Sequence, residues 1–91
     1  MKDNKEYDKL KELLEEDFSW PGEYMFKFIV PFLPKTIEQT EALFDANASI
    51  TMRESKSLKY MSITAKQIMK NPSEVIAVYH KAEAIEGIMG L

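Results

Sequence analysis

The clearest pattern in the chain is an alternation of side chains over residues 24–30, which are mostly aromatic or β-branched. Such residues favour a strand, and Pro31 ends it because proline cannot donate to a sheet. Period-two geometry puts one set on one face: Tyr24, Phe26, Phe28 and Val30. The other face carries Met25, Lys27 and Ile29. We assign the aromatic face to the core, because the opposite register would bury Lys27 without a visible partner.

Three further segments predict strands. Residues 49–53 place Ile50 and Met52 inward, and residues 58–68 alternate over a longer stretch. The inward side chains of that stretch are Met61, Ile63 and Ala65. Residues 54–57 are polar and rich in serine, which suits a hairpin connection although no Asn-Gly or Asp-Gly pair is present. Residues 88–91 predict a short terminal strand.

The first of three predicted helices spans residues 5–16 and is strongly charged. Its narrow apolar stripe consists of Tyr7, Leu10, Leu13 and Leu14. A helix of this length is marginal alone, so we expect it to dock on the body of the protein or to fray. Pro21 and Gly22 then interrupt the helix, and Trp20 beside them is expected to fill the core or cover one end of the sheet.

The second predicted helix follows Pro34. Thr36 and Gln39 have the spacing of a capping box, in which each side chain satisfies a free backbone N–H of the first turn. We expect this helix to reach about Asp45, with Asn47 suited to its end.

The third predicted helix has the strongest start signal in the chain. Asn71 suits the N-cap, Pro72 is preorganised for the first helical position, and Glu74 completes a capping box. An apolar stripe at helical period continues to Ile85, and Gly87 supplies a left-handed stop.

The element order after the first helix is therefore β-α-β-β-α-β. Right-handed connections place both crossover helices on the same side of a four-stranded antiparallel sheet. This predicts an α+β, ferredoxin-like sandwich. Residues 1–17 form an N-terminal helical arm, and residues 18–91 form the domain.

One face of such a sheet is left without helices. Met25, Ile29 and Tyr60 are predicted to lie in the middle of this face, and exposed apolar groups there indicate a surface that something covers. The arm, a second copy of the chain and a different partner are all left open as coverings. The candidate partner-binding residues are Met25, Lys27, Ile29, Arg53, Tyr60 and Ser62.

Charge argues against nucleic acid as the partner. The chain carries a formal charge of −3. The arm, with four lysines and seven carboxylates, accounts for all of it, and the remainder is neutral. A nucleic-acid interface needs clustered Lys and Arg, and RNA-recognition sheets need two or three outward aromatics where this one offers Tyr60.

The chain also lacks recognisable catalytic chemistry. It has no cysteine and a single histidine, His80, so neither a metal site nor a catalytic triad can be assembled from visible partners. The loop at residues 31–35 contains two prolines and no glycine, which makes it a poor phosphate cradle. We expect no enzyme, no metal and no cofactor. Charges interrupt every apolar run and no signal peptide opens the chain, so we expect a cytoplasmic protein without a membrane segment.

Four stretches of the chain carry a distinctive pattern: residues 20–31 (WPGEYMFKFIVP), 53–64 (RESKSLKYMSIT), 75–79 (VIAVY) and 87–91 (GIMGL). Together they resemble the YbeD-like family of uncharacterised small bacterial proteins. The resemblance implies a ferredoxin-like fold close to the ACT regulatory domains, which bind amino acids and modulate enzymes. It also implies a regulatory role, because a role in regulation near lipoate metabolism has been suggested for relatives. The family usually has a glycine before Lys-Tyr in its turn, where this chain has Leu58.

The sequence therefore supports two hypotheses about function. The first is a non-enzymatic regulatory or adaptor domain that binds a protein partner, or itself, through the open sheet face or a sheet edge. The alternative is an ACT-type sensor of a small molecule such as an amino acid or a lipoate-related compound.

Overall fold

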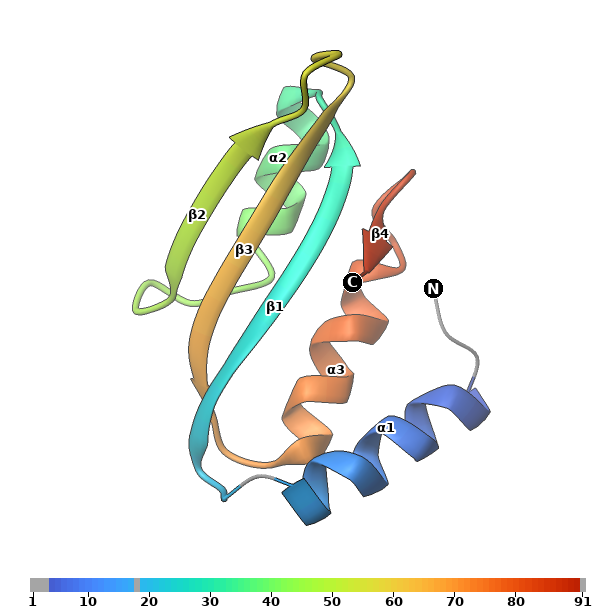
Figure 1. Ribbon diagram of the computed structural model, residues 1–91, viewed down its shortest axis with the longest axis vertical. Helices are drawn as coiled ribbons and strands as arrows, with labels where there is room; N and C mark the ends of the chain where they lie inside the picture. The colour runs from blue at the N-terminus through green and yellow to red at the C-terminus, as the bar shows by residue number, and fades with distance from the viewer. Residues whose placement is uncertain (1–3, 18, 91) are drawn as a thin grey trace.

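The computed structural model describes residues 4–17 and 19–90. Its elements are α1 (Asn4–Asp17), β1 (Gly22–Pro31), α2 (Pro34–Glu41), β2 (Ser49–Glu54), β3 (Tyr60–Met69), α3 (Pro72–Ala82) and β4 (Met89–Gly90). The four strands form one antiparallel sheet in the order β2-β3-β1-β4, with the two crossover helices on the same side (Figure 1). The predicted α+β, ferredoxin-like arrangement with an N-terminal helix is confirmed.

The strand register agrees with the sequence-based assignment of the faces. Phe26, Phe28 and Val30 of β1 are fully buried, and Ile63 and Ala65 of β3 lie opposite and beside them in the core. Lys27 is exposed on the other side. Burial of these apolar side chains supplies the main driving force for the fold. Removing one large apolar side chain from water stabilises the folded state by roughly 1.5–3 kcal/mol.

Helix α3 begins with Asn71 at the N-cap and Pro72 in the first turn, as predicted, but within the described residues the Glu74 side chain makes no hydrogen bond that would complete the predicted capping box. The side-chain Oδ1 of Asn71 accepts a hydrogen bond from the backbone N–H of Glu74 at 2.9 Å, and Pro72 occupies the first turn. The regular helix ends at Ala82, three residues before the predicted limit, although Ile85 is still buried in the turn that follows. Gly87 has φ 77°, the left-handed conformation expected of a glycine stop.

The capping box predicted for α2 is wrong. The helix begins at Pro34, so Thr36 lies inside its first turn, and no side chain caps it at Leu33. The Thr36 hydroxyl donates instead to the carbonyl oxygens of Pro31 and Leu33, at 2.6 and 3.0 Å. Proline explains the shift, because its fixed φ and missing N–H suit the first helical position. The helix also ends earlier than expected, at Glu41 rather than Asp45.

Helix α1 docks beside α3 and does not cover the open face of the sheet (Figure 1). Tyr7 and Leu14 are buried in the main core cluster, and the indole Nε1–H of Trp20 donates to the carbonyl oxygen of Leu14 at 2.9 Å. Leu13, by contrast, is 53% exposed. Of the three coverings considered from the sequence, the arm is therefore wrong: its apolar stripe is used on the helix side.

Candidate partner-binding face

The side of the sheet opposite α2 and α3 is called here the open face. Strand pairing arranges its side chains in rows across β2, β3 and β1. The three central rows are Arg53–Ser62–Ile29, Thr51–Thr64–Lys27 and Ser49–Lys66–Met25. Tyr60 opposite Pro31 forms the row at one end, and Ile68 opposite Glu23 forms the row at the other. All six candidate residues named from the sequence lie on this face.

The apolar groups of the open face form two separate ends. Tyr60, Ile29 and Met89 of β4 share one end, where Met89 pairs with Ile29 and is exposed. Met25 and Ile68 share the other end, and both are more than half exposed. Tyr60 lies six positions from Lys66, which pairs with Met25, so the two ends are roughly 20 Å apart. Met25, Ile29 and Tyr60 thus lie on the two central strands, as predicted, but Met25 is separated from the other two along the strands. Ile68 and Met89 were missed: the alternation that places Tyr60 and Lys66 on this face also reaches Ile68, whereas Met89 is placed there only by its pairing with Ile29.

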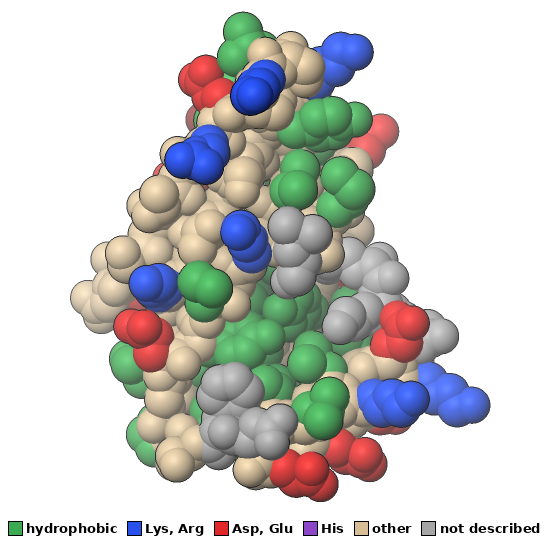
Figure 2. All heavy atoms as spheres, viewed as in Figure 1, with side chains coloured by type: hydrophobic (Ala, Val, Ile, Leu, Met, Phe, Trp, Pro, Cys, Tyr) green, Lys and Arg blue, Asp and Glu red, His purple; other side chains and the backbone are tan. Residues whose placement is uncertain are grey.

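The centre of the open face is polar and cationic. A hollow of about 370 Å³ is lined by Lys27, Thr51, Met52, Arg53, Ser62 and Thr64. Lys66 lies in the next row, and no carboxylate occurs in the three central rows. Figure 2 shows Lys and Arg side chains spread over the strands, whereas acidic and basic side chains lie together along α1 at the lower right. The face thus carries three positive charges on a chain whose net charge is −3.

The donors around this hollow have no partners within the part of the chain that the structure describes. Neither Lys27 nor Arg53 makes an ion pair or a side-chain hydrogen bond there, and the hydroxyls of Thr51, Ser62 and Thr64 make no hydrogen bond. Ser62 and Thr64 are half-buried nonetheless. The centre therefore presents several unused hydrogen-bond donors to anything that approaches the sheet.

A second hollow, of about 390 Å³, lies at the end of β1. Its lining comes from the loop after that strand, the start of α2 and the turn before β4: Pro31, Leu33, Lys35, Thr36, Gln39, Glu86 and Gly87. Gly87 is closely packed here, because a Cβ on it would lie 2.8 Å from Cγ of Pro31. Lys35 and Glu86 give this hollow one cation and one anion.

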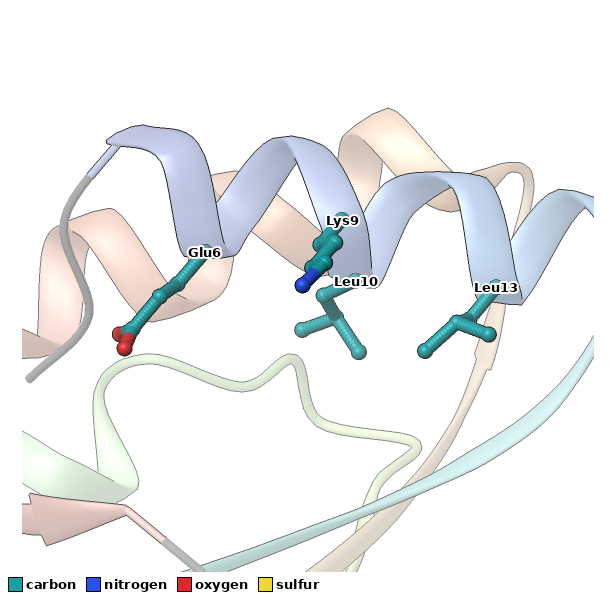
Figure 3. Close-up of a pocket in the computed structure, with 4 residues that line it drawn as sticks. All are labelled: Glu6, Lys9, Leu10 and Leu13. Atoms are coloured by element: carbon teal, nitrogen blue, oxygen red, sulfur yellow. The ribbon is translucent and has the colours of Figure 1, made fainter.

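A third hollow, of about 280 Å³, lies under α1 and is lined by Glu6, Lys9, Leu10 and Leu13. Figure 3 shows these four side chains extending from one side of the helix. The hollow is wide open to solvent on a helix held mainly by Tyr7 and Leu14, which explains why Leu13 stays half exposed. We assign it to incomplete packing of the arm.

His80 and the tyrosines form a structural cluster between α1, α3 and β1. The centroids of the Tyr7 and His80 rings lie 4.4 Å apart, and His80 Nδ1 lies 3.9 Å from Glu83 Oε2. The hydroxyls of Tyr24 and Tyr79 are 3.1 Å apart. Burial, together with the hydrogen bond to Tyr24, raises the pKa of Tyr79 well above 10 and keeps its phenol neutral. These groups pack α1, α3 and β1 against one another.

Within residues 4–17 and 19–90, no group of three or more His, Cys, Asp and Glu side chains is arranged to hold a metal ion. Within the same described ranges, no helix has the length and apolar character required to cross a membrane. Comparison of the chain with protein-family models, curated proteins and solved structures found no match.

Proposed function

We propose that this protein is a non-enzymatic binding module whose open face docks an acidic surface of another protein. The observation that carries the proposal is the layout of that face: three cations lie in the middle, exposed apolar side chains lie at both ends, and none of the helices within residues 4–17 and 19–90 covers it. Protein interfaces combine buried apolar anchors with polar groups that set orientation, and Tyr60 and Arg53 are residue types enriched at such anchors.

Charge complementarity selects the kind of partner. The positive centre attracts carboxylates and speeds encounter with an acidic surface, especially at low ionic strength. Two copies of this chain placed face to face would instead bring Lys27, Arg53 and Lys66 against the same cations of the second copy. Like charges facing one another disfavour association, so we infer that the occupant is a different protein.

The proposal is tested with a double variant, Ile29→Glu with Tyr60→Glu, which places carboxylates in one apolar end of the face. Immobilised wild-type protein is used to recover a partner, which is then purified and titrated against each variant. Leu13→Glu is the matched control, because Leu13 is equally an exposed apolar residue but lies on α1.

We expect the double variant to weaken binding by roughly 100-fold and the Leu13→Glu variant to bind as the wild type does. Equal affinity of the double variant and the wild type would overturn the proposal. Sedimentation of the wild-type protein alone gives a further outcome. A dimer that the double variant dissociates would assign the open face to a second copy.

A second candidate function is a small-molecule sensor, and the hollow at the end of β1 favours it. Its Lys35 and Glu86 are of opposite charge, which suits the carboxylate and ammonium groups of an amino acid. The resemblance to YbeD-like proteins, and through them to ACT domains, also points to such a ligand. Leu58 supports that resemblance, because its φ of 58° is a conformation that glycine favours and the family usually has glycine there.

This second candidate is tested by a thermal-shift panel of amino acids and lipoate. Ligand at 100 times its dissociation constant stabilises the folded state by about 2.7 kcal/mol, which a shift in Tm reports. We expect Lys35→Gln to abolish the shift and Lys81→Gln, an exposed lysine of α3, to leave it unchanged. A flat response across the panel would count against these ligands.

A further inference from the structure

We propose that the hollow in the centre of the open face is a subsite for a phosphoryl group. The inference rests on the open face being the binding surface, and it adds the chemistry of the group that the face recognises. It depends on Lys27, Arg53, Thr51, Ser62 and Thr64, which line the hollow.

The register brings these side chains together from three strands. Thr64 of β3 lies directly between Thr51 of β2 and Lys27 of β1. Ser62, two positions away on β3, pairs with Arg53. Neighbouring strands are about 4.8 Å apart, so the two long cationic side chains approach the central hydroxyls from opposite edges. An anion in the hollow would therefore meet donors on both sides and beneath it.

The number and kind of donors favour a phosphoryl group over a carboxylate. A phosphate monoester carries nearly two negative charges at pH 7 and three strong acceptor oxygens. Lys27 and Arg53 supply two positive charges, and the guanidinium of Arg53 can bind two oxygens side by side. The three hydroxyls supply further donors that no other group of the described chain uses. A single carboxylate carries one negative charge, so it would leave one of the two positive charges uncompensated.

A phosphoryl group could arrive in two forms. It could belong to a phosphorylated side chain of the acidic partner, or to a small phosphorylated molecule. Both forms present the same terminal oxygens, so the subsite chemistry is shared and the source is decided by experiment.

The test is a titration of the ¹⁵N-labelled full chain, followed by the positions of its backbone amide signals. The probes are inorganic phosphate, an acidic peptide with a central phosphoserine flanked by glutamates, and the same peptide with serine. Arg53→Gln and Lys27→Gln remove one cation each, and Lys81→Gln is the matched control on α3. All three positions are exposed, so the variants should fold.

We expect saturable shifts that centre on Thr51, Ser62 and Thr64 with a phosphorylated probe. Affinity should fall by roughly tenfold or more in Arg53→Gln and in Lys27→Gln and stay unchanged in Lys81→Gln. Tighter binding of the phosphopeptide than of phosphate would identify a protein-borne group, and equal binding a free ligand.

Two results would overturn the inference. The first is that the amide signals shift without saturating, or shift in Arg53→Gln as they do in the wild type. The other is equal affinity for the serine and phosphoserine peptides, which would remove the phosphoryl subsite while leaving the docking of an acidic surface intact. Loss of binding to both peptides, combined with partner binding that survives Ile29→Glu with Tyr60→Glu, would show that the proposed function itself has failed.

Discussion

The hydroxyl of Tyr7 on α1 donates a hydrogen bond to Oε1 of Glu83, which follows α3 and lies 76 residues away in the chain. This contact fixes the N-terminal helix to the helix side of the domain. The phenol ring also packs on His80. Tyr7 and Leu14 of the α1 stripe are therefore buried on the helix side, and the open face is left without a covering from within the described chain.

We predict that Tyr7→Ala destabilises the protein by about 3 kcal/mol, because it removes a buried aromatic side chain as well as the hydrogen bond. Tyr7→Phe, which keeps the ring, should cost at most about 1 kcal/mol. Urea unfolding measures both. Leu13→Ala on the exposed side of the same helix is the control, and a Tyr7→Ala effect no larger than that of Leu13→Ala would show that α1 is not docked as described.

Leu58 is held in a left-handed conformation with φ 58°, and its side chain is 62% exposed. A non-glycine residue pays roughly 1–2 kcal/mol for this conformation, whereas glycine adopts it freely but loses more entropy on folding. We predict that Leu58→Gly stabilises the protein by about 0.5–1 kcal/mol, measured by urea or thermal unfolding. Ser57→Gly, at a position without positive φ, should be neutral or destabilising. If Leu58→Gly lowers the free energy of unfolding, the turn geometry is wrong.

The raised pKa of Tyr79 makes stability depend on pH in the alkaline range. The folded chain keeps this phenolic proton while the unfolded chain, with a pKa near 10.0, releases it. The stabilisation is therefore fully present below pH 10 and is lost as the pH rises above that value. Between pH 10 and 11 the wild-type free energy of unfolding should fall more steeply than that of Tyr79→Phe, by up to about 1.4 kcal/mol per pH unit. Parallel curves would contradict a buried neutral phenol.

Asn71 caps the N-terminus of α3. We predict that Asn71→Ala costs about 1 kcal/mol, because the backbone N–H of Glu74 loses the side-chain acceptor at 2.9 Å and keeps only the longer bond, of 3.2 Å, to the carbonyl oxygen of residue 71. Asn47→Ala is the matched control, since the side chain of Asn47 is exposed. The free energies of unfolding of the two variants, measured by chemical denaturation, should therefore differ by about 1 kcal/mol. Equal stability of the two variants would mean that the Asn71 cap contributes nothing.

Local chemistry explains why much of the fold could be read from the sequence. The alternation over Tyr24 to Val30 has a single register that buries the aromatics and exposes Lys27, and the structure has that register. Asn71 and Pro72 are likewise sufficient, by their own geometry, to start a helix.

The sequence-based predictions fail where two local signals compete for one helix start, or where contacts with distant segments determine how an element packs. Thr36 matched a capping box, but Pro34 two residues earlier was the better first residue of α2. The stripe of α1 could have met either side of the sheet, and the contacts of Tyr7 with His80 and Glu83, together with the burial of Leu14, place it on the helix side.

The candidate site was predicted as a set of residues but not as an arrangement. Period-two alternation identifies which side chains share the open face. Their order along it depends on the pairing of strands, which separates Met25 from Tyr60 and collects Arg53, Lys27 and the hydroxyls around one hollow. Sequence reasoning therefore named the face without locating its cationic centre.

Protection of backbone amides from hydrogen exchange, with and without the purified partner, tests the central claim most directly. We predict that the partner slows exchange along β1, β2 and β3, at Lys27, Arg53 and Tyr60 and the residues between them in the rows. Amides of α1 and α3 should be unaffected. Protection confined to those helices, with the strands unchanged, would contradict a docking role for the open face.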